Sequence, residues 1–367
     1  RRVARDQLAV TGLAKGTPKT APAAGSVPKL PDVPVITIDF PTPEEEELTR
    51  RFTVNRNYLQ ALAGFLTTTY GRREKLYEGL RSTVEAMPPY HKIQRGQADE
   101  DEVRRYLMLA WTSEIQLHLP AIMGNTSMLA FANTWAPVHA YYAVYGTLQG
   151  WFTANGMTGV SDDHTATLRT IAKQIEQRDL FPQPWNLLAI GCPMRKERLH
   201  LNDRGENCTG HIEVLSIPVP FGGDPDFWPR LGTWLRSTRE ARLTAREDQW
   251  KRREKKQRIA PAERTKIAQS LAPTSLFDCF WRMRIKSNYG TIEPYLVNRV
   301  SESDHSIYNS ALCTVTRATV ALLELYIIRR IGKPAFAQIA TDFANQDTHN
   351  LTAKMLQARL AAYDITL

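Results

Sequence analysis

Residues 301–331 read SESDHSIYNSALCTVTRATVALLELYIIRRI and open with a helix-start signal. Ser301 followed three residues later by Asp304 is a capping-box pattern, which is typical of a helix N-terminus. Behind it, apolar residues recur at the 3.6-residue period of one helix face: Ile307, Ala311, Val315, Leu322 and Leu325. The stretch therefore predicts a long helix over about 303–331.

Similar patterns recur toward both ends of the chain. Thr42 and Pro43 before three glutamates indicate a helix start. Pro120 is expected to stop one helix, and Pro137 to kink or split the next. Besides the helix above, helices are predicted over about 43–66, 72–87, 99–119, 127–154, from Ser161 onward, 230–258, 334–345 and 348–363. Short strands are expected only near 35–40 and 211–219, so the predicted fold class is mainly α.

Changes of composition divide the chain into segments. The Pro-rich stretch 1–41 cannot build a packed element and is predicted to be a disordered tail. Pro and Gly interrupt the helical pattern between Phe181 and Asp226, and a basic helix follows. The predicted organisation is an N-terminal helical segment (42–98), a helical bundle in two parts (99–178 and 273–331), an insertion between these parts (179–272) and a C-terminal helical segment (332–367).

Composition excludes several classes of protein. The chain has 367 residues, of which 43% are hydrophobic and 23% charged, so bulk disorder is excluded. No apolar run approaches the roughly 18 residues of a membrane span, and residues 1–16 lack the apolar core of a secretory signal. Four cysteines without an export signal indicate a reducing compartment. We therefore expect a cytoplasmic protein with no membrane partner.

The positive charge is concentrated in one segment. Residues 230–258 hold eleven Lys/Arg and four Asp/Glu, a net charge of +7 out of +9 for the chain. A basic helix with Trp228, Trp234 and Trp250 nearby can neutralise phosphates and stack on bases. An acidic protein partner and a plain solvated helix are the alternatives. The predicted nucleic-acid contacts, with RNA favoured over DNA, are Arg242, Arg246, Lys251, Arg252, Arg253, Lys255, Lys256 and Arg258.

Two stretches carry a resemblance to a known family. Ala140–Ala143 read Ala-Tyr-Tyr-Ala, and His164 opens the next predicted helix. Downstream, Trp281–Tyr289 form a basic element with Asn288 where an Asp is usual. Together these resemble HEPN domains, which are small helical bundles of prokaryotic toxins, defence systems and nucleotidyltransferase partners. The resemblance implies one HEPN-like bundle built from 100–178 and 273–331, with 179–272 inserted.

The resemblance also implies a possible activity. Nuclease members of the family use an Arg-x(4–6)-His motif for metal-independent RNA cleavage, commonly paired across a dimer. There the Arg stabilises charge on the phosphate while the His transfers protons. Three such spacings occur in the chain, a number close to chance, and only Arg299 with His305 sits at a capped helix start. The alternative is an ordinary loop Arg and a capping His.

Four further residues are of metal-ligand type. Cys192, His200, Cys208 and His211 follow one another in the Gly/Asn-rich part of the insertion. Thiolates and imidazoles are the usual ligands of tetrahedral zinc. Only Cys208 and His211 are closely spaced, so free thiols and surface histidines are the alternative. No other cofactor is expected, because the chain holds no P-loop, dinucleotide-binding or zinc-protease motif.

These observations give two functional hypotheses. The first is a nucleic-acid-binding HEPN-like protein, with a ribonuclease activity at Arg299 and His305, that acts as a toxin or defence effector. The second is a non-catalytic helical subunit or adaptor of a larger nucleic-acid-processing complex. The first requires Arg and His side chains around one phosphate, within a homodimer or an internal pair of sites. The second requires an apolar patch on the surface of the bundle.

Overall fold

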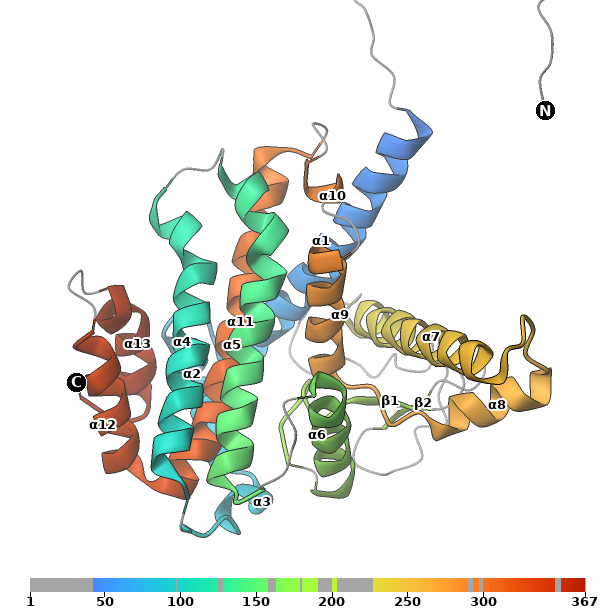
Figure 1. Cartoon of the computed structure of the whole chain (residues 1–367). Helices are drawn as coiled ribbons and strands as arrows, with labels where there is room; N and C mark the ends of the chain where they lie inside the picture. Colours follow the sequence, from blue (N-terminus) through green and yellow to red (C-terminus); the bar gives the residue numbers. More distant parts are fainter. Residues whose placement is uncertain are drawn as a thin grey trace, which may run out of the picture. The chain divides into compact units, whose positions relative to one another are not determined.

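The structure is a computed structural model, and Figure 1 shows its helices and strands. It describes residues 42–96, 98–124, 128–157, 163–178, 180–190, 200–202, 227–289, 293–296, 300–346 and 351–366. The predicted tail at 1–41 and the predicted strand near 211–219 lie outside these residues. From Pro41 to Leu367 the chain forms one unit.

The described residues are mostly helical, which confirms the mainly α fold class. In chain order the helices are α1 (Pro43–Tyr70), α2 (Lys75–Glu85), α3 (Pro88–His91), α4 (Glu100–Ile122), α5 (Leu129–Ala154), α6 (His164–Arg178), α7 (Phe227–Glu254), α8 (Pro261–Ser270), α9 (Leu276–Tyr289), α10 (Glu293–Leu296), α11 (Glu302–Ile331), α12 (Lys333–Ala344) and α13 (Leu351–Ala362). Strands β1 (Leu188–Ile190) and β2 (His200–Asn202) pair antiparallel, with Leu188 opposite Asn202.

Several boundaries differ from those predicted. Pro120 does not stop α4, which continues to Ile122, and Pro137 does not split α5. An internal proline costs a helix about 3 kcal/mol, and for α5 the packing against α4, α9 and α11 offsets this cost. The basic helix α7 ends at Glu254 rather than near 258, and Pro261 begins the unpredicted helix α8, because proline suits the first helical turn. Strands β1 and β2 were not predicted from their short sequences.

Helix α11 is the central element of the fold. Ser301 caps it as predicted, since its hydroxyl accepts a hydrogen bond from the backbone N–H of Asp304 at 3.1 Å. Helices α1, α2, α4, α5 and α12 all pack against it. By length and composition α11 could cross a membrane, but 89% of its most apolar window is buried inside the protein. It therefore occupies the position of a core helix.

One hydrophobic core connects the predicted segments. Buried side chains of α1, α4, α5, α7, α9, α11, α12 and α13 belong to a single cluster. Phe52 of α1 and Phe227 of α7 are both part of it, at 1% exposure each. The N-terminal helices and the first helix after the Pro/Gly-rich stretch thus share their core with the bundle.

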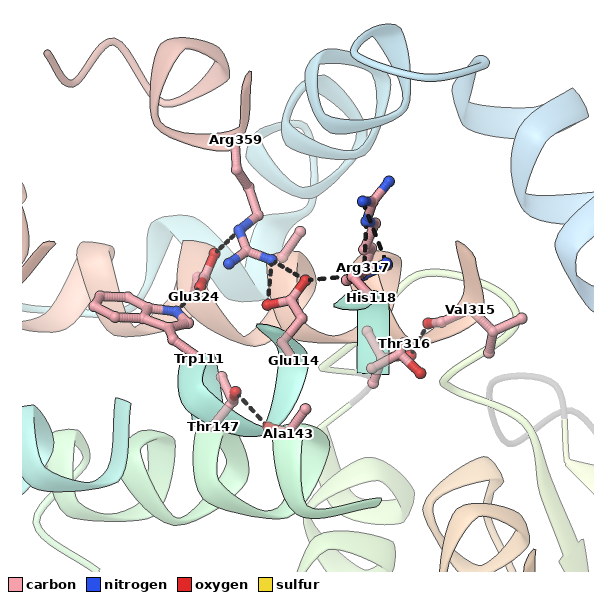
Figure 2. A network of polar contacts seen from close by, with 12 residues as sticks. Trp111, Glu114, His118, Ala143, Thr147, Val315, Thr316, Arg317, Glu324 and Arg359 are labelled. Atoms are coloured by element: carbon pink, nitrogen blue, oxygen red, sulfur yellow. Dashed lines mark hydrogen bonds and ion pairs between the residues drawn. The ribbon is translucent and has the colours of Figure 1, made fainter. Parts of the chain in front are cut away.

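Three charged side chains meet inside this core, as Figure 2 shows. Glu114 of α4, Glu324 of α11 and Arg359 of α13 are each at most 1% exposed. The Nη1 of Arg359 donates to both carboxylate oxygens of Glu114, at 2.8 and 2.9 Å, and its Nε lies 2.9 Å from Glu324 Oε2. Trp111 Nε1 and the Tyr363 hydroxyl donate to Glu324 at 2.6 and 2.9 Å. The network ties α13 to α4 and α11.

The network carries two carboxylates and one guanidinium. Burial raises the pKa of Glu324, although Arg359 opposes this shift and Glu114 adds to it. Breaking such a buried group leaves charge without a partner in a medium that solvates it poorly. Arg359 is therefore the residue on which the position of the C-terminal helix depends.

We predict that Arg359→Met lowers the free energy of unfolding by about 3–5 kcal/mol at pH 8, measured by chemical denaturation. Without the guanidinium, which opposes the shift, the pKa of Glu324 rises further above its unfolded value. The stabilisation from such groups is present at low pH and lost as pH rises, so the deficit shrinks toward pH 5. Lys354→Met, at an exposed position of the same helix, is the control and should change stability little. A deficit below 1 kcal/mol would contradict this account.

Candidate nucleic-acid interface

Six of the eight predicted phosphate contacts lie at the surface. Arg246, Arg252 and Arg253 are exposed on α7, which ends at Glu254. Lys255, Lys256 and Arg258 are exposed in the turn beyond it. Lys255 ends the helix with a positive φ of 52°, and the Lys256 ammonium lies 5.7 Å from the ring centre of Trp250. The basic run is thus the exposed tip of the α7–α8 pair.

The other two predicted contacts, Arg242 and Lys251, are only partly exposed. Arg242 forms an ion pair with Asp278 of α9 at 3.0 Å and donates to the carbonyl oxygen of Pro273 at 3.0 Å. Its side chain is only 15% exposed. Lys251 pairs with Asp248 at 3.2 Å. Arg242 therefore fastens α7 to the start of α9. The carboxylate of Asp278 is buried away from water, so a cationic partner is needed to offset the cost of burying its charge.

Two of the three tryptophans that were predicted to stack on bases are buried instead. Trp228 and Trp234 are 5% and 3% exposed and belong to the core. Trp234 stacks on Tyr58 with ring centres 5.7 Å apart, and Trp228 packs edge-on against Phe65. Among the three tryptophans, only Trp250 is partly exposed beside the basic run.

A larger basic hollow lies between α6, α7, α8 and α9. Its volume is about 690 Å³, and Trp281 of α9 forms part of its wall. Asp163 and Asp278 are its acidic lining residues, and Asp278 is already paired with Arg242. Cations outnumber acids in its lining: Arg169, Arg242, Arg246, Arg282 and Lys286.

Two neighbouring hollows extend this one. A hollow of about 410 Å³ between α1, α7, α9 and α10 shares Arg282 and Lys286 with it and adds Arg50 and Arg51. A hollow of about 430 Å³ between α7 and α8 shares Arg246 and adds Arg253, Lys266 and Trp250. We call these three hollows, which share lining residues, the basic groove. Each section contains at least one aromatic side chain: Tyr58, Trp234 and Tyr295, then Trp281, then Trp250.

Helix α9 supplies the cations where two sections of the groove meet. Arg282 donates from Nη1 to the hydroxyls of Ser237 and Thr238 at 2.6 and 3.2 Å, so α7 holds it in place. Lys286, one turn further on, is exposed and has no carboxylate within 4.0 Å among the described residues. Partial desolvation of its ammonium, with Arg282 and Arg51 nearby, lowers the pKa of Lys286 to about 8. Cations held this close together favour an anionic ligand.

The residues of the HEPN resemblance meet on the opposite side of α9. The Tyr141 hydroxyl and His164 Nδ1 are 2.8 Å apart, and Arg284 Nη2 donates to the Tyr142 hydroxyl at 3.0 Å. The Arg284 guanidinium also lies 5.4 and 5.2 Å from the ring centres of Tyr141 and Tyr142. Arg284 is 8% exposed, whereas Lys286 on the same helix is exposed. Arg282, Arg284 and Lys286 occupy every second position of α9. Arg284 is therefore buried on one side of the helix, while Arg282 and Lys286 line the groove on another.

The structure describes only one residue of the predicted catalytic pair, His305. Arg299 lies outside the described residues. His305 is 4% exposed, and its ring centre lies 5.0 Å from that of Phe52. Asn133 donates to the backbone carbonyl oxygen of His305 at 3.0 Å. Burial lowers the pKa of His305, so it is neutral in the core. Catalysis by this pair stays a prediction, and the position of His305 offers no open site for a phosphate.

The predicted zinc ligands are not brought together in the described part of the chain. Cys192, Cys208 and His211 lie outside it, and His200 is known only as a backbone position in β2. No group of three or more His, Cys, Asp or Glu side chains within the described ranges could hold a metal ion. Cys279 and Cys313 are buried free thiols, and burial raises the pKa of each to about 12.

We predict that His305→Ala lowers the free energy of unfolding by about 2–3 kcal/mol, because it leaves a cavity beside Phe52. The lowered pKa of His305 means that protonation opposes folding. The wild-type protein therefore loses stability as pH falls below about 6.5, and this loss should be smaller in the variant. Chemical denaturation at pH 5 and pH 8 measures both effects. Exposed His91→Ala is the control, and an equal effect of both substitutions would contradict the burial of His305.

The arrangement can bind a phosphate chain and stack bases, and it rests on α1, α6, α7, α8, α9 and α10 together. Sequence reasoning found α7 but missed Arg169 of α6 and Arg50 and Arg51 of α1, which come close only through folding. The basic spacing of Arg282 and Lys286 was the available signal for α9.

Comparison of the chain with protein-family models, with curated proteins and with solved structures finds no match in any of the three.

Proposed function

We propose that this protein binds single-stranded nucleic acid, RNA in preference to DNA, through the basic groove. The observation that carries the proposal is the groove itself: three neighbouring hollows whose linings hold both cations and aromatic side chains. A duplex presents its phosphates outward and hides its bases, so it would use the cations alone. A single strand can use both kinds of side chain.

The charges of the groove support phosphate rather than metal or neutral ligands. Arg50 and Arg51 share the single carboxylate of Glu47, at 2.7 and 2.8 Å, which leaves excess positive charge. Arg169 of α6 and Lys286 of α9 have no ion-pair partner among the described residues. Each phosphate that binds releases condensed counterions, so affinity should depend steeply on salt.

The exposed tip of the α7–α8 pair extends the same surface. Arg253 belongs both to the predicted run and to the third section of the groove. Arg252, Lys255, Lys256 and Arg258 lie next to it in the chain and are exposed. We assign them a second, peripheral set of phosphate contacts, which would position a strand without reading its bases.

Catalysis is not part of this proposal, because His305 lies in the core. A HEPN-like bundle, a ribonuclease at Arg299 and His305, and a role as toxin or defence effector remain predictions. The proposal fits the second hypothesis, a non-catalytic helical subunit or adaptor of a larger nucleic-acid-processing complex. The buried free thiols of Cys279 and Cys313 are compatible with the cytoplasmic location that it includes.

We predict that replacing Arg169, Arg246 and Lys286 together with Gln weakens binding of a fluorescent oligoadenylate RNA at least tenfold at moderate salt. The log–log slope of affinity against salt should become shallower by about 2, since each single-strand contact contributes about 0.7. Fluorescence anisotropy across salt concentrations measures both quantities. All three residues are exposed, so stability should change little.

A charge-matched control replaces three exposed cations that do not line the groove with Gln: Lys75, Lys92 and Lys354. This control should alter the salt slope much less than the groove variant. Equal effects of the two triple variants would reject the groove as the binding site and leave only a diffuse effect of net charge. Equal binding of DNA and RNA would remove the preference for RNA.

We also predict that RNA affinity of the wild-type protein falls as pH rises from 7 to 9. The pKa of Lys286 is about 8, so its ammonium is lost across this range, and with it one attraction to phosphate. Lys286→Arg should keep the affinity constant across the range because arginine stays protonated. Lys286→Gln should show a weaker, constant affinity. A wild-type affinity that does not change between pH 7 and 9 would contradict the role of Lys286.

A further inference from the structure

The first section of the basic groove, between α1, α7, α9 and α10, concentrates positive charge in a small space. Its volume is about 410 Å³, against about 690 Å³ for the middle section between α6, α7, α8 and α9. Its cations are Arg50 and Arg51 of α1 and Arg282 and Lys286 of α9. Among the described residues, Glu47 alone adds a negative charge to the lining. One carboxylate does not balance four cations, so the section attracts anions.

The two cations of α9 are partly withdrawn from water without an acidic partner. Arg282 is held by the hydroxyls of Ser237 and Thr238. In the part of the chain that the structure describes, no carboxylate lies within 4.0 Å of Arg282 or Lys286. Burial lowers the pKa of Arg282, and desolvation, with repulsion from Arg282 and Arg51, lowers the pKa of Lys286 to about 8. An anion bound beside such cations would stabilise both of them.

The cations of α1 are oriented, but their donors are not all used. Glu47 accepts hydrogen bonds from the Nε of Arg50 and from the Nε of Arg51, each at 2.8 Å. Arg50 donates a second one from Nη2 at 2.9 Å. Within the described residues, the Nη groups of Arg51 form no hydrogen bond. The planar fork of a guanidinium matches two oxygens of one phosphate, so Arg51 can bind an anion while it keeps its contact with Glu47.

The aromatic side chains of the first section leave little surface for a base. Trp234 and Tyr295 are 3% and 8% exposed. Tyr58 stacks on Trp234, with ring centres 5.7 Å apart. By contrast, Trp281 of the middle section is partly exposed. The first section therefore suits a phosphate, and the middle section suits the base next to it.

The first section also forms one end of the groove among the described hollows. It shares Arg282 and Lys286 with the middle section, and it shares no lining residue with the third. A phosphate within a strand carries a single negative charge. A phosphate at the end of a strand is a monoester with a charge of about −1.5 to −2 at pH 7 and three acceptor oxygens. The terminal group therefore matches a site of four cations better than an internal phosphate does.

We propose that the first section binds the terminal phosphate monoester of a single strand, with Arg51, Arg282 and Lys286 as its ligands and the terminal base on Trp281. This inference rests on the proposed function and deepens it, because it makes the end of a strand the preferred ligand. The 5′ and 3′ ends can both carry the same monoester, so the experiment separates them.

Binding of matched strands tests the proposal. Three oligoadenylate RNAs of one length would carry a 5′-phosphate, a 3′-phosphate or hydroxyls at both ends, and would compete with a fluorescent oligoadenylate for the full-length protein. One phosphorylated strand should bind about tenfold more tightly than the hydroxyl strand, as expected for one added charge-assisted contact. The end that gains affinity gives the direction of the strand in the groove. Equal affinity of all three strands, or an equal gain from both phosphates through added charge alone, would overturn the proposal.

A substitution confined to the first section gives a second readout. Arg51 is exposed and lines this section alone among the three. Arg51→Gln leaves Glu47 paired with Arg50, so the fold should be kept. The gain from the terminal phosphate should fall to about threefold or less, while affinity for the hydroxyl strand should change much less. Arg72→Gln, at an exposed position outside the groove, loses the same charge and should keep the full gain. A full gain in Arg51→Gln, or an equal loss in Arg72→Gln, would overturn the proposal.

The same titrations separate this proposal from the function on which it rests. If no strand binds, the basic groove is not a nucleic-acid site and both proposals fail. If the hydroxyl strand binds and replacement of Arg169, Arg246 and Lys286 weakens it, but a terminal phosphate adds nothing, only the preference for a strand end fails.

Discussion

The fold depends on the burial of α11 along nearly its whole length. A thirty-residue helix with apolar side chains on every face needs neighbours on every face. Helices α1, α2, α4, α5 and α12 supply them. Because α11 also carries Glu324 into the core, the fold needs a buried cation, and Arg359 brings α13 into place to provide it (Figure 2). The buried carboxylates of Glu324 and Glu114 thus help to fix the position of the C-terminal helix.

Helix α9 connects this core to the candidate function. One side of it is buried, with Cys279 and Phe280 at 0% and 2% exposure. The other side carries Arg282 and Lys286 into the basic groove, where α1, α6, α7 and α8 close in around them. The rigid core therefore holds cations from separate segments in one place, where partial desolvation, together with repulsion from Arg282 and Arg51, lowers the pKa of Lys286. A bound phosphate chain would relieve this repulsion.

Sequence patterns predicted those features that depend on neighbours in the chain. The caps at Thr42 and Ser301 and the long helix 302–331 follow from local chemistry, and the structure confirms them. The partners of Arg242 and the burial of His305 depend on residues tens to hundreds of positions away, so no local pattern could reveal them. The charge count of 230–258 was correct, yet it could not separate side chains that face solvent from those that fasten helices together. The groove was missed for the same reason, since its lining comes from six helices.

The most direct test of the central claim is to map where RNA touches the protein. Short single-stranded RNA containing 4-thiouridine would be crosslinked to the wild-type protein by long-wavelength light, and the modified peptides identified by mass spectrometry. The account predicts crosslinks at aromatic side chains of the basic groove, above all Trp281 of α9 and Trp250 of α7. Crosslinks confined to α2, α12 or α13, or no crosslinks under conditions where RNA binds, would contradict it.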